Sequence, residues 1–171
     1  LFRSLIDRLI DCYRRANHTV AVLAIDPSSP ISGGALLGDR LRMQRHSDDP
    51  GVFIRSLAAR KQRGGLTATT PAIVRVLAAQ FDIVIIETVG AGQNDVDVAD
   101  VADYVVVVLT PELGDEIQRA KAGLLEIADL VVTNKSDLGH RATGLSVSAK
   151  TGAGVAELAK KILQATTRSA K

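Results

Sequence analysis

The chain has 171 residues and a mass of 18.1 kDa, enough for one domain with an apolar core. Its 21 basic and 19 acidic residues nearly balance, and the 3% aromatic content without Trp argues against a surface that stacks nucleic-acid bases. Its apolar runs are of strand length, the first residues show no secretory signal pattern, and the single Cys12 cannot form an internal disulfide, so we expect a cytoplasmic protein without membrane or nucleic-acid partners.

Hydrophobic periodicity predicts an alternation of helices and strands along the chain. Residues 1–16 place their apolar side chains on one helical stripe, and residues 20–25 form an apolar run of strand length. The remaining predicted elements are a short strand at 52–56, a helix beginning near Pro71, a strand at 83–86, a short helix at 94–102, a strand at 104–109, a helix at 115–127, strands at 130–133 and 145–147, and a helix at 155–163. This order predicts an α/β fold with a doubly wound, mainly parallel sheet in one domain over residues 1–171.

The stretch at residues 81–93 organises the predicted sheet. Four consecutive β-branched apolar residues, 83–86, predict a strand buried on both faces. The strand ends at Glu87 and a glycine-rich turn follows at Gly90. Ligands bind at the carboxyl ends of strands in open α/β sheets, where a carboxylate can hold a hydrated metal ion and a glycine lets the backbone approach a phosphate. Taken alone, the stretch is equally compatible with a solvated glutamate and an ordinary turn.

The sharpest motif is Asn134-Lys135-Ser136-Asp137, directly after the predicted strand at 130–133. Guanine presents two adjacent donors, its ring N–H and its exocyclic amine, which the carboxylate of Asp137 can accept together. Adenine leaves such a carboxylate unpaired, and sites of this kind reject the wrong partner by up to roughly 10⁴-fold. The stem of Lys135 can lie along the base, and Asn134 can tie neighbouring loops together.

A second polar turn follows the next predicted strand. Ser148-Ala149-Lys150 offers a backbone N–H for the guanine carbonyl oxygen and a second lysine near the base. Alone, the tripeptide is also compatible with a plain turn before a helix. In combination with the strand end at residues 134–137, it indicates a guanine-nucleotide site.

Three acidic residues, Asp26, Asp39 and Glu87, are candidates for a magnesium site. Magnesium keeps several waters and takes one or two carboxylates together with phosphate oxygens. Asp26 and Glu87 both stand at predicted strand ends, so their convergence is expected. Capping of a short helix at residues 40–43 explains Asp39 equally well.

The phosphate cradle expected beside a guanine site, Gly-x-x-x-x-Gly-Lys-Ser/Thr, does not occur in the sequence. The pairs Gly33-Gly34 and Gly64-Gly65 lack the preceding strand and the following lysine. Because the chain begins without Met inside a predicted helix, we expect an N-terminally truncated GTPase domain. Its first strand and phosphate loop would precede Leu1.

With these residues in hand, the chain resembles the methylmalonyl-CoA mutase-associated GTPases, which also carry the name LAO/AO transport-system kinases and have a P-loop NTPase fold. Ordinary Ras-like GTPases have Asp at the position of Glu87, so the sequence from Glu87 to Gly90 distinguishes the two families. The resemblance covers nearly the whole chain, and the segments that carry it are residues 22–30, 33–43, 87–93, 114–123 and 134–137.

The resemblance implies a magnesium-dependent, homodimeric enzyme that hydrolyses GTP to GDP. It would act as a chaperone and gate cofactor loading for an adenosylcobalamin-dependent methylmalonyl-CoA mutase. It also implies that Asp26, Asp39 and Glu87 surround magnesium and the attacking water. Residues 111–121 would form a nucleotide-sensing switch through Gln118 and Lys121, although a plain surface helix could carry the same residues.

Some features separate the chain from the family pattern and keep alternatives open. The interval between Asp137 and Ser148 is shorter than the helical segment usual in the family, so either residues are missing near 138–144 or this member is trimmed there. A non-hydrolysing nucleotide-sensing module would explain the missing cradle. A metallochaperone GTPase is the third alternative, but one Cys and three scattered His do not suggest a metal-cargo site.

Overall fold

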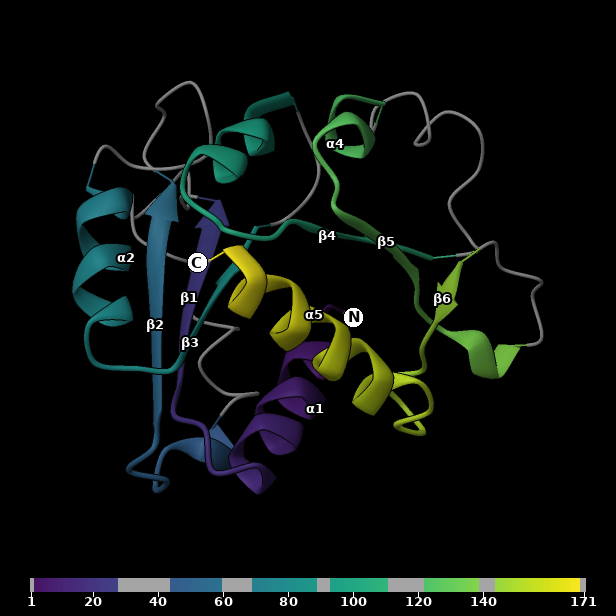
Figure 1. The fold of residues 1–171 in the computed structure, drawn as a ribbon, viewed down its shortest axis with the longest axis horizontal. Coiled ribbons are helices and arrows are strands. Elements are labelled where there is room, and N and C mark those ends of the chain that lie inside the picture. The colour runs from purple at the N-terminus through teal and green to yellow at the C-terminus, as the bar shows by residue number, and fades with distance from the viewer. Residues whose placement is uncertain are drawn as a thin grey trace. The chain divides into compact units, whose positions relative to one another are not determined.

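The computed structural model describes residues 2–27, 44–59, 69–88, 93–110, 122–138 and 144–169. The chain divides into two compact units, which we call unit 1 (Leu1–Cys12 with Ala102–Lys171) and unit 2 (Tyr13–Val101). Strands and helices alternate along the chain and every strand pairing is parallel, which confirms the predicted α/β class (Figure 1). Among the described residues the strand ladders form two three-stranded sheets, one in each unit, where the sequence predicted a single sheet.

Unit 2 contains the sheet of strand order β2-β1-β3. Strand β1 (Val20–Pro27) lies between β2 (Val52–Ala59) and β3 (Ile83–Glu87), with Val20 in register with both Val52 and Ile83. Because β1 has a neighbour on each side, its apolar run is almost completely buried. Helix α2 (Thr70–Ala78) begins with Pro71 in its first turn, as predicted, and packs against β3.

The prediction that β3 is buried on both faces is wrong for the structure described. All five residues of β3 are only half-buried. The reason is that β3 lies at the edge of its described sheet and pairs with β1 alone. The apolar run therefore predicted the strand correctly, but it did not reveal how many neighbours the strand has.

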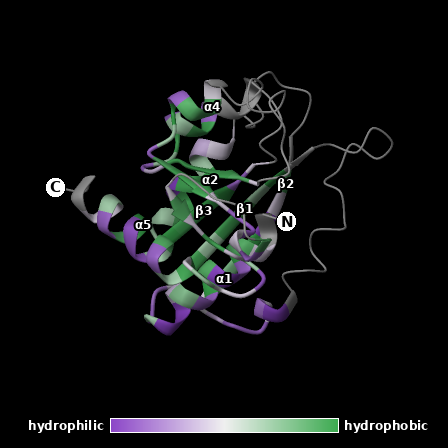
Figure 2. Ribbon diagram, turned by 90° about the vertical axis from the view of Figure 1, so that its right-hand side faces the viewer, coloured by the Kyte–Doolittle hydropathy of each residue, from purple (hydrophilic) through white to green (hydrophobic). Residues whose placement is uncertain are grey.

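Unit 1 contains the sheet of strand order β4-β5-β6. Strand β5 (Leu130–Thr133) has the predicted bounds and lies between β4 (Val106–Leu109) and β6 (Leu145–Ser146). The same unit contains the short helix α4 (Ala122–Glu126) and the long helix α5 (Val155–Ser169). Figure 2 shows mixed hydrophobic and hydrophilic turns along α5, as expected for a helix with one buried face.

Helix α1 (Phe2–Arg15) confirms the amphipathic helix predicted at the start of the chain. Its apolar positions recur every three or four residues, and their side chains are at most 7% exposed: Leu5, Ile6, Leu9, Ile10 and Tyr13. Arg14 and Arg15 occupy its last turn, where positive charge is favourable. Within the described ranges, no helix is long and apolar enough to cross a lipid bilayer.

Several element bounds differ from the predicted ones. Strands β1 and β2 run further than predicted, β4 begins at Val106, and α5 continues to Ser169. In the additional turn of α5, the hydroxyls of Thr166 and Thr167 donate to carbonyls of the preceding helical turn. The predicted short helix at 94–102 is confirmed as a 3₁₀ helix, Gln93–Asp100. Of the predicted helix at 115–127 only the end is described, and the short helix expected after Asp39 lies outside the described residues.

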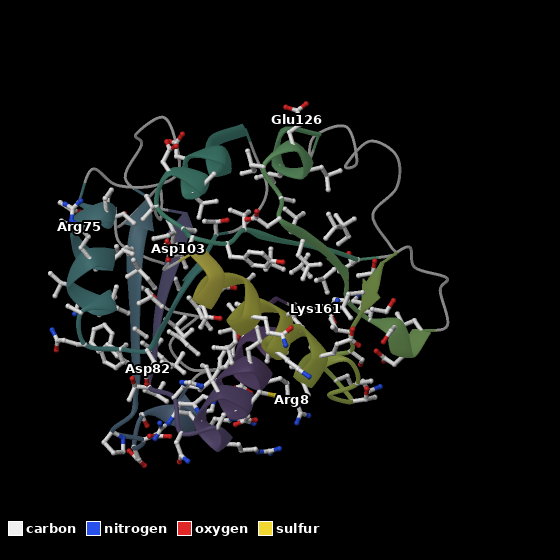
Figure 3. All side chains as sticks on the ribbon, in the orientation of Figure 1. Arg8, Arg75, Asp82, Asp103, Glu126 and Lys161 are labelled. Atoms are coloured by element: carbon white, nitrogen blue, oxygen red, sulfur yellow. The ribbon has the colours of Figure 1, made fainter. Side chains whose placement is uncertain are left out.

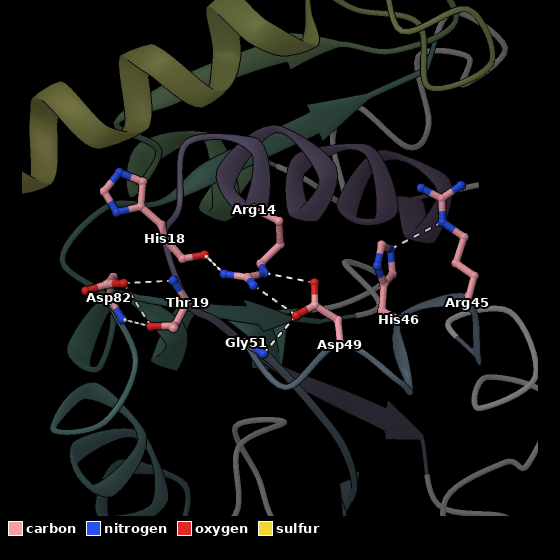
Figure 4. Close-up of polar contacts among 8 residues, drawn as sticks. All are labelled: Arg14, His18, Thr19, Arg45, His46, Asp49, Gly51 and Asp82. Carbon is pink, nitrogen blue, oxygen red and sulfur yellow. Dashed lines mark hydrogen bonds and ion pairs between the residues drawn. The ribbon is translucent and has the colours of Figure 1, made fainter.

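An ion pair joins α1 to the segment before β2 at the amino ends of the strands of unit 2 (Figure 4). The Nε–H of Arg14 donates to Asp49 Oδ2, and one terminal N–H donates to Asp49 Oδ1, both at 2.9 Å. The other terminal nitrogen donates to the His18 carbonyl, also at 2.9 Å. The Gly51 N–H also donates to Asp49, at 2.8 Å. A side chain at Gly51 would meet the Arg14 guanidinium, which is the movable end of that side chain and would have to shift.

A second contact in unit 2 fixes the start of β3. The backbone N–H and the hydroxyl of Thr19 donate to Asp82 Oδ2 at 2.7 and 2.8 Å, and the Asp82 N–H donates back to the hydroxyl. The Ile83 N–H then donates to the Thr19 carbonyl. These contacts set the register of β3 on β1 and therefore the position at which Glu87 ends the strand.

The Arg14–Asp49 pair makes stability depend on pH. Hydrogen bonds from the Arg14 side chain and, secondarily, the Gly51 N–H lower the pKa of Asp49 below its ordinary 3.8. The stabilisation is therefore present above pH 3.8 and is lost as pH falls through the lowered pKa. We expect Arg14→Gln to lower the thermal midpoint at neutral pH and to flatten the loss of stability on acidification, as measured by circular dichroism.

The matched control is Arg15→Gln, which alters an exposed arginine in the same turn of α1. It should leave both the midpoint and its acid dependence close to those of the wild type. An Arg14→Gln protein that melts like the control at every pH would contradict the role of the pair.

Candidate nucleotide-binding site

The residues after β5 form a sharp turn in unit 1. Asn134 is 1% exposed, and its backbone N–H donates to the Leu109 carbonyl of β4 at 2.8 Å. Lys135 has φ +66, in the left-handed region that residues other than glycine rarely adopt. Such a strained conformation at a strand end is typical of functional sites. The turn leads into a 3₁₀ helix, Ser136–Leu138, which carries the exposed Asp137.

The loop after β6 meets this turn, as the sequence predicted. The buried Ser148 hydroxyl donates to Asp137 Oδ1 at 2.6 Å, and it accepts the Thr151 N–H at 3.1 Å. The Ser148 hydrogen bond, assisted by the charges of Lys150 and Lys135, lowers the pKa of Asp137. Asp137 is therefore an ionised, oriented carboxylate at neutral pH that can accept hydrogen bonds from a ligand.

Asn134 links the two turns through its side-chain oxygen. Its Oδ1 accepts the Lys135 N–H at 2.8 Å and the Ala149 N–H at 3.1 Å. These two donors fix the orientation of the amide, because a flipped amide would direct N–H groups at N–H groups. The prediction that Asn134 ties neighbouring loops together is confirmed.

The other side-chain atom of Asn134 has no partner in the described structure. Nδ2 is buried and donates no hydrogen bond within the described residues. Leaving a buried donor unpaired costs about 1–3 kcal/mol, so such groups usually mark the place of a ligand or a water. A ligand with a hydrogen-bond acceptor facing Nδ2 would remove this cost.

Two glycines shape the return from this loop into α5. Gly152 and Gly154 have φ +84 and +71, the left-handed region that favours glycine. A side chain at Gly154 would overlap the Ser146 carbonyl at the end of β6, whereas the space around Gly152 is open. Gly154 therefore brings the start of α5 against the strand that delivers Ser148. No motif in the sequence assigned this role to Gly154.

Arg8 of α1 also contacts the loop, and nothing in its local sequence predicts this. Its Nε donates to the Ala149 carbonyl at 3.3 Å, and a terminal nitrogen donates to the Lys150 carbonyl at 3.2 Å. Figure 3 labels the Arg8 side chain among those of the molecule. The contact joins residues 141 positions apart in the sequence. The only feature of the sequence that bears on this contact is that α1 carries charged residues, among them Arg8, beside its apolar stripe.

The carboxylates expected around magnesium are only partly described. In unit 2, Glu87 ends β3 opposite Ala24, and Asp26 lies two residues further along β1. The backbone therefore places both at the carboxyl ends of adjacent strands, as predicted. The Asp26 side chain, Asp39, Gly90, Gln118 and Lys121 lie outside what the structure describes. Among the residues it describes, no three His, Cys, Asp or Glu side chains form a group suited to a metal ion.

Comparison with known proteins identifies relatives of the chain. Residues 3–147 match the family model described as "Methylmalonyl Co-A mutase-associated GTPase MeaB". A Pyrococcus horikoshii protein that is named as a GTPase is 55% identical over 135 residues. The match covers 78% of this chain and 43% of that protein. A Mycobacterium tuberculosis "Probable GTPase" is 47% identical over 124 residues, covering 72% of this chain and 37% of that protein.

A mouse protein, "Methylmalonic aciduria type A homolog, mitochondrial", is 47% identical over 133 residues, covering 75% of this chain and 32% of that protein. The chain thus spans less than half the length of these curated relatives. The family match extends over most of the chain and includes both β5 and the Asn134–Asp137 turn that follows it. The chain belongs to the methylmalonyl-CoA mutase-associated GTPase family.

Proposed function

We propose that the complete protein binds GTP and GDP through unit 1, hydrolyses GTP with magnesium, and uses the two nucleotide states as a switch for an adenosylcobalamin-dependent methylmalonyl-CoA mutase. The observation that carries the proposal is the joined pair of turns after β5 and β6. They hold an ionised Asp137 and leave the buried Nδ2 of Asn134 without a partner in the described structure.

The chemistry of guanine suits both groups. Its ring N–H and exocyclic amine are adjacent donors to one carboxylate, and the Ser148 hydroxyl orients the ionised Asp137 for such a contact. Its opposite edge carries the N7 and O6 acceptors, which an amide N–H such as Asn134 Nδ2 can meet. Adenine replaces the O6 acceptor with an N–H donor on that edge. Asp137 therefore carries the proposed preference for guanine, while Asn134 Nδ2 can meet N7 in either purine and O6 in guanine alone.

Support for hydrolysis comes from the family and from the strand ends of unit 2. The homologues that are named as GTPases share the chain's sequence over about three quarters of its length. Magnesium would neutralise charge on the phosphates, and Asp26, Asp39 and Glu87 are the residues we propose to hold it or orient its waters. Gly90 would let the backbone approach the terminal phosphate, and Gln118 and Lys121 would sense it.

Support for the mutase as partner comes from names alone. The family model carries the mutase in its description, and the mouse relative is named for methylmalonic aciduria. The same proposal includes a chaperone and cofactor-loading role, a homodimeric state and a cytoplasmic location. The first two follow from the family resemblance, and the location follows from the single Cys12 and the first residues, which show no secretory signal pattern.

Base selectivity should depend on Asp137. We expect Asp137→Asn in the complete protein to weaken GTP binding by about tenfold to a hundredfold, because a charge-assisted acceptor is lost. The same change should shift preference toward xanthosine triphosphate, since the new amide can donate to the oxygen that replaces the guanine amine. Calorimetric titration with both nucleotides measures the effect. The control is Asp103→Asn, which alters an exposed carboxylate of the same unit. Unchanged GTP affinity in Asp137→Asn would refute the base assignment.

The partner is tested by nucleotide turnover. We expect an adenosylcobalamin-dependent mutase from the same source to stimulate GTP hydrolysis by the complete protein, because a switch needs different contacts with its reader in its two states. Phosphate release with and without the mutase gives the comparison. Turnover that the mutase leaves unchanged would contradict the partner, while leaving the guanine-nucleotide assignment intact.

A further inference from the structure

One guanidinium holds two successive carbonyls of the loop that follows β6. Arg8 is half-buried in the middle of α1, and Leu5 and Leu9 on either side of it are buried in the core. Their burial fixes the rotation of the helix, so that Arg8 faces the loop and contacts the carbonyls of Ala149 and Lys150. Both contacts lie within unit 1.

Holding a carbonyl also aims the next backbone N–H. The peptide group is planar, and no cis peptide bond occurs in the described residues, so each carbonyl and the following N–H point in opposite directions. When Arg8 holds the Lys150 carbonyl, the Thr151 N–H of the same peptide group is directed away from α1. The structure shows where it goes, because the Thr151 N–H donates to Ser148 Oγ at 3.1 Å.

The same path continues to the base-reading carboxylate. Ser148 Oγ, which accepts the Thr151 N–H, donates its own proton to Asp137 Oδ1 at 2.6 Å. A hydroxyl that accepts one hydrogen bond becomes a better donor in the next, so the links strengthen one another. A continuous path of polar contacts therefore runs from Arg8 through the Lys150 peptide group and Ser148 to Asp137.

We propose that Arg8 is a positioning residue for guanine recognition. It fixes the peptide groups after Ser148 so that the Ser148 hydroxyl is oriented toward Asp137, and in this way it couples helix α1 to the reading of the base. This inference rests on the proposed function. Arginine suits the position because its planar fork presents two donors at a fixed spacing, whereas a lysine ammonium is a single compact donor group that cannot match both carbonyls in the same way.

The decisive comparison uses GTP and inosine triphosphate, which lacks the exocyclic amine that Asp137 is proposed to accept. We expect Arg8→Lys in the complete protein to weaken GTP binding by about tenfold, the loss of one to two hydrogen bonds. Binding of inosine triphosphate should weaken less, so the ratio of the two affinities falls. Arg8→Gln, which also removes the charge, should lower the ratio at least as far. Arg15→Lys on the same helix should leave it unchanged.

A second readout needs no nucleotide. Hydrogen exchange at the Thr151 amide should speed up in Arg8→Lys, because the Lys150 peptide group that carries this N–H is no longer held in line with Ser148 Oγ. A purely stabilising role of Arg8 predicts something different, namely a lower thermal midpoint and an equal loss of affinity for GTP, inosine triphosphate and inorganic tripolyphosphate.

The outcomes separate this inference from the function on which it rests. A wild-type protein that prefers GTP, together with an Arg8→Lys protein that keeps the wild-type affinity ratio or the wild-type Thr151 exchange rate, overturns the positioning role alone. A wild-type protein that shows no preference for GTP over inosine triphosphate and ATP overturns the guanine assignment, and the positioning role with it.

Discussion

The hydrogen bond from the buried Ser148 hydroxyl to Asp137 holds the candidate site together. Ser148 is fully buried and its Oγ lies 2.6 Å from Asp137 Oδ1, while the charge of the carboxylate is preserved by the lowered pKa. Without this contact, Asp137 would be an exposed side chain on a short helix with nothing to orient it. A recognition carboxylate must be both ionised and fixed in direction. Asp137 is ionised at neutral pH, and the Ser148 hydroxyl fixes its direction.

The parallel sheet of unit 1 makes that contact possible. Val132 and Thr133 of β5 are in register with Leu145 and Ser146 of β6, so both strands end at the same edge of the sheet. The residues that follow the two strands, Asn134 after β5 and Ser148 after β6, therefore lie close to each other. The Ser136 N–H to Val147 carbonyl bond and the Ala149 N–H to Asn134 bond fasten the two turns. Ligand sites of α/β proteins occur at this edge for the same geometric reason.

Local pattern predicted the elements of the fold and the residues of the two turns, but not how these parts contact one another. Strand β5 and the motif after it were predictable because an uninterrupted apolar run followed at once by polar residues is a local signal. The edge position of β3 was not, because its apolar run is the same whether one strand or two lie beside it. Arg8 was not predictable either, since its partners lie 141 and 142 residues away and are backbone carbonyls, which every residue type possesses. Gly154 is needed for its distance from Ser146, a tertiary constraint that the sequence shows only as a glycine in a turn.

The most direct test of the central claim follows the Asn134 side-chain amide by nitrogen-15 NMR in the complete protein. Nδ2 is buried without an acceptor in the described structure, so a ligand that fills the site must change its environment. The account predicts that GDP shifts the Asn134 amide resonances and slows their exchange with water, while ADP at the same concentration does neither. Resonances that stay in place with GDP, or that respond equally to GDP and ADP, would contradict it.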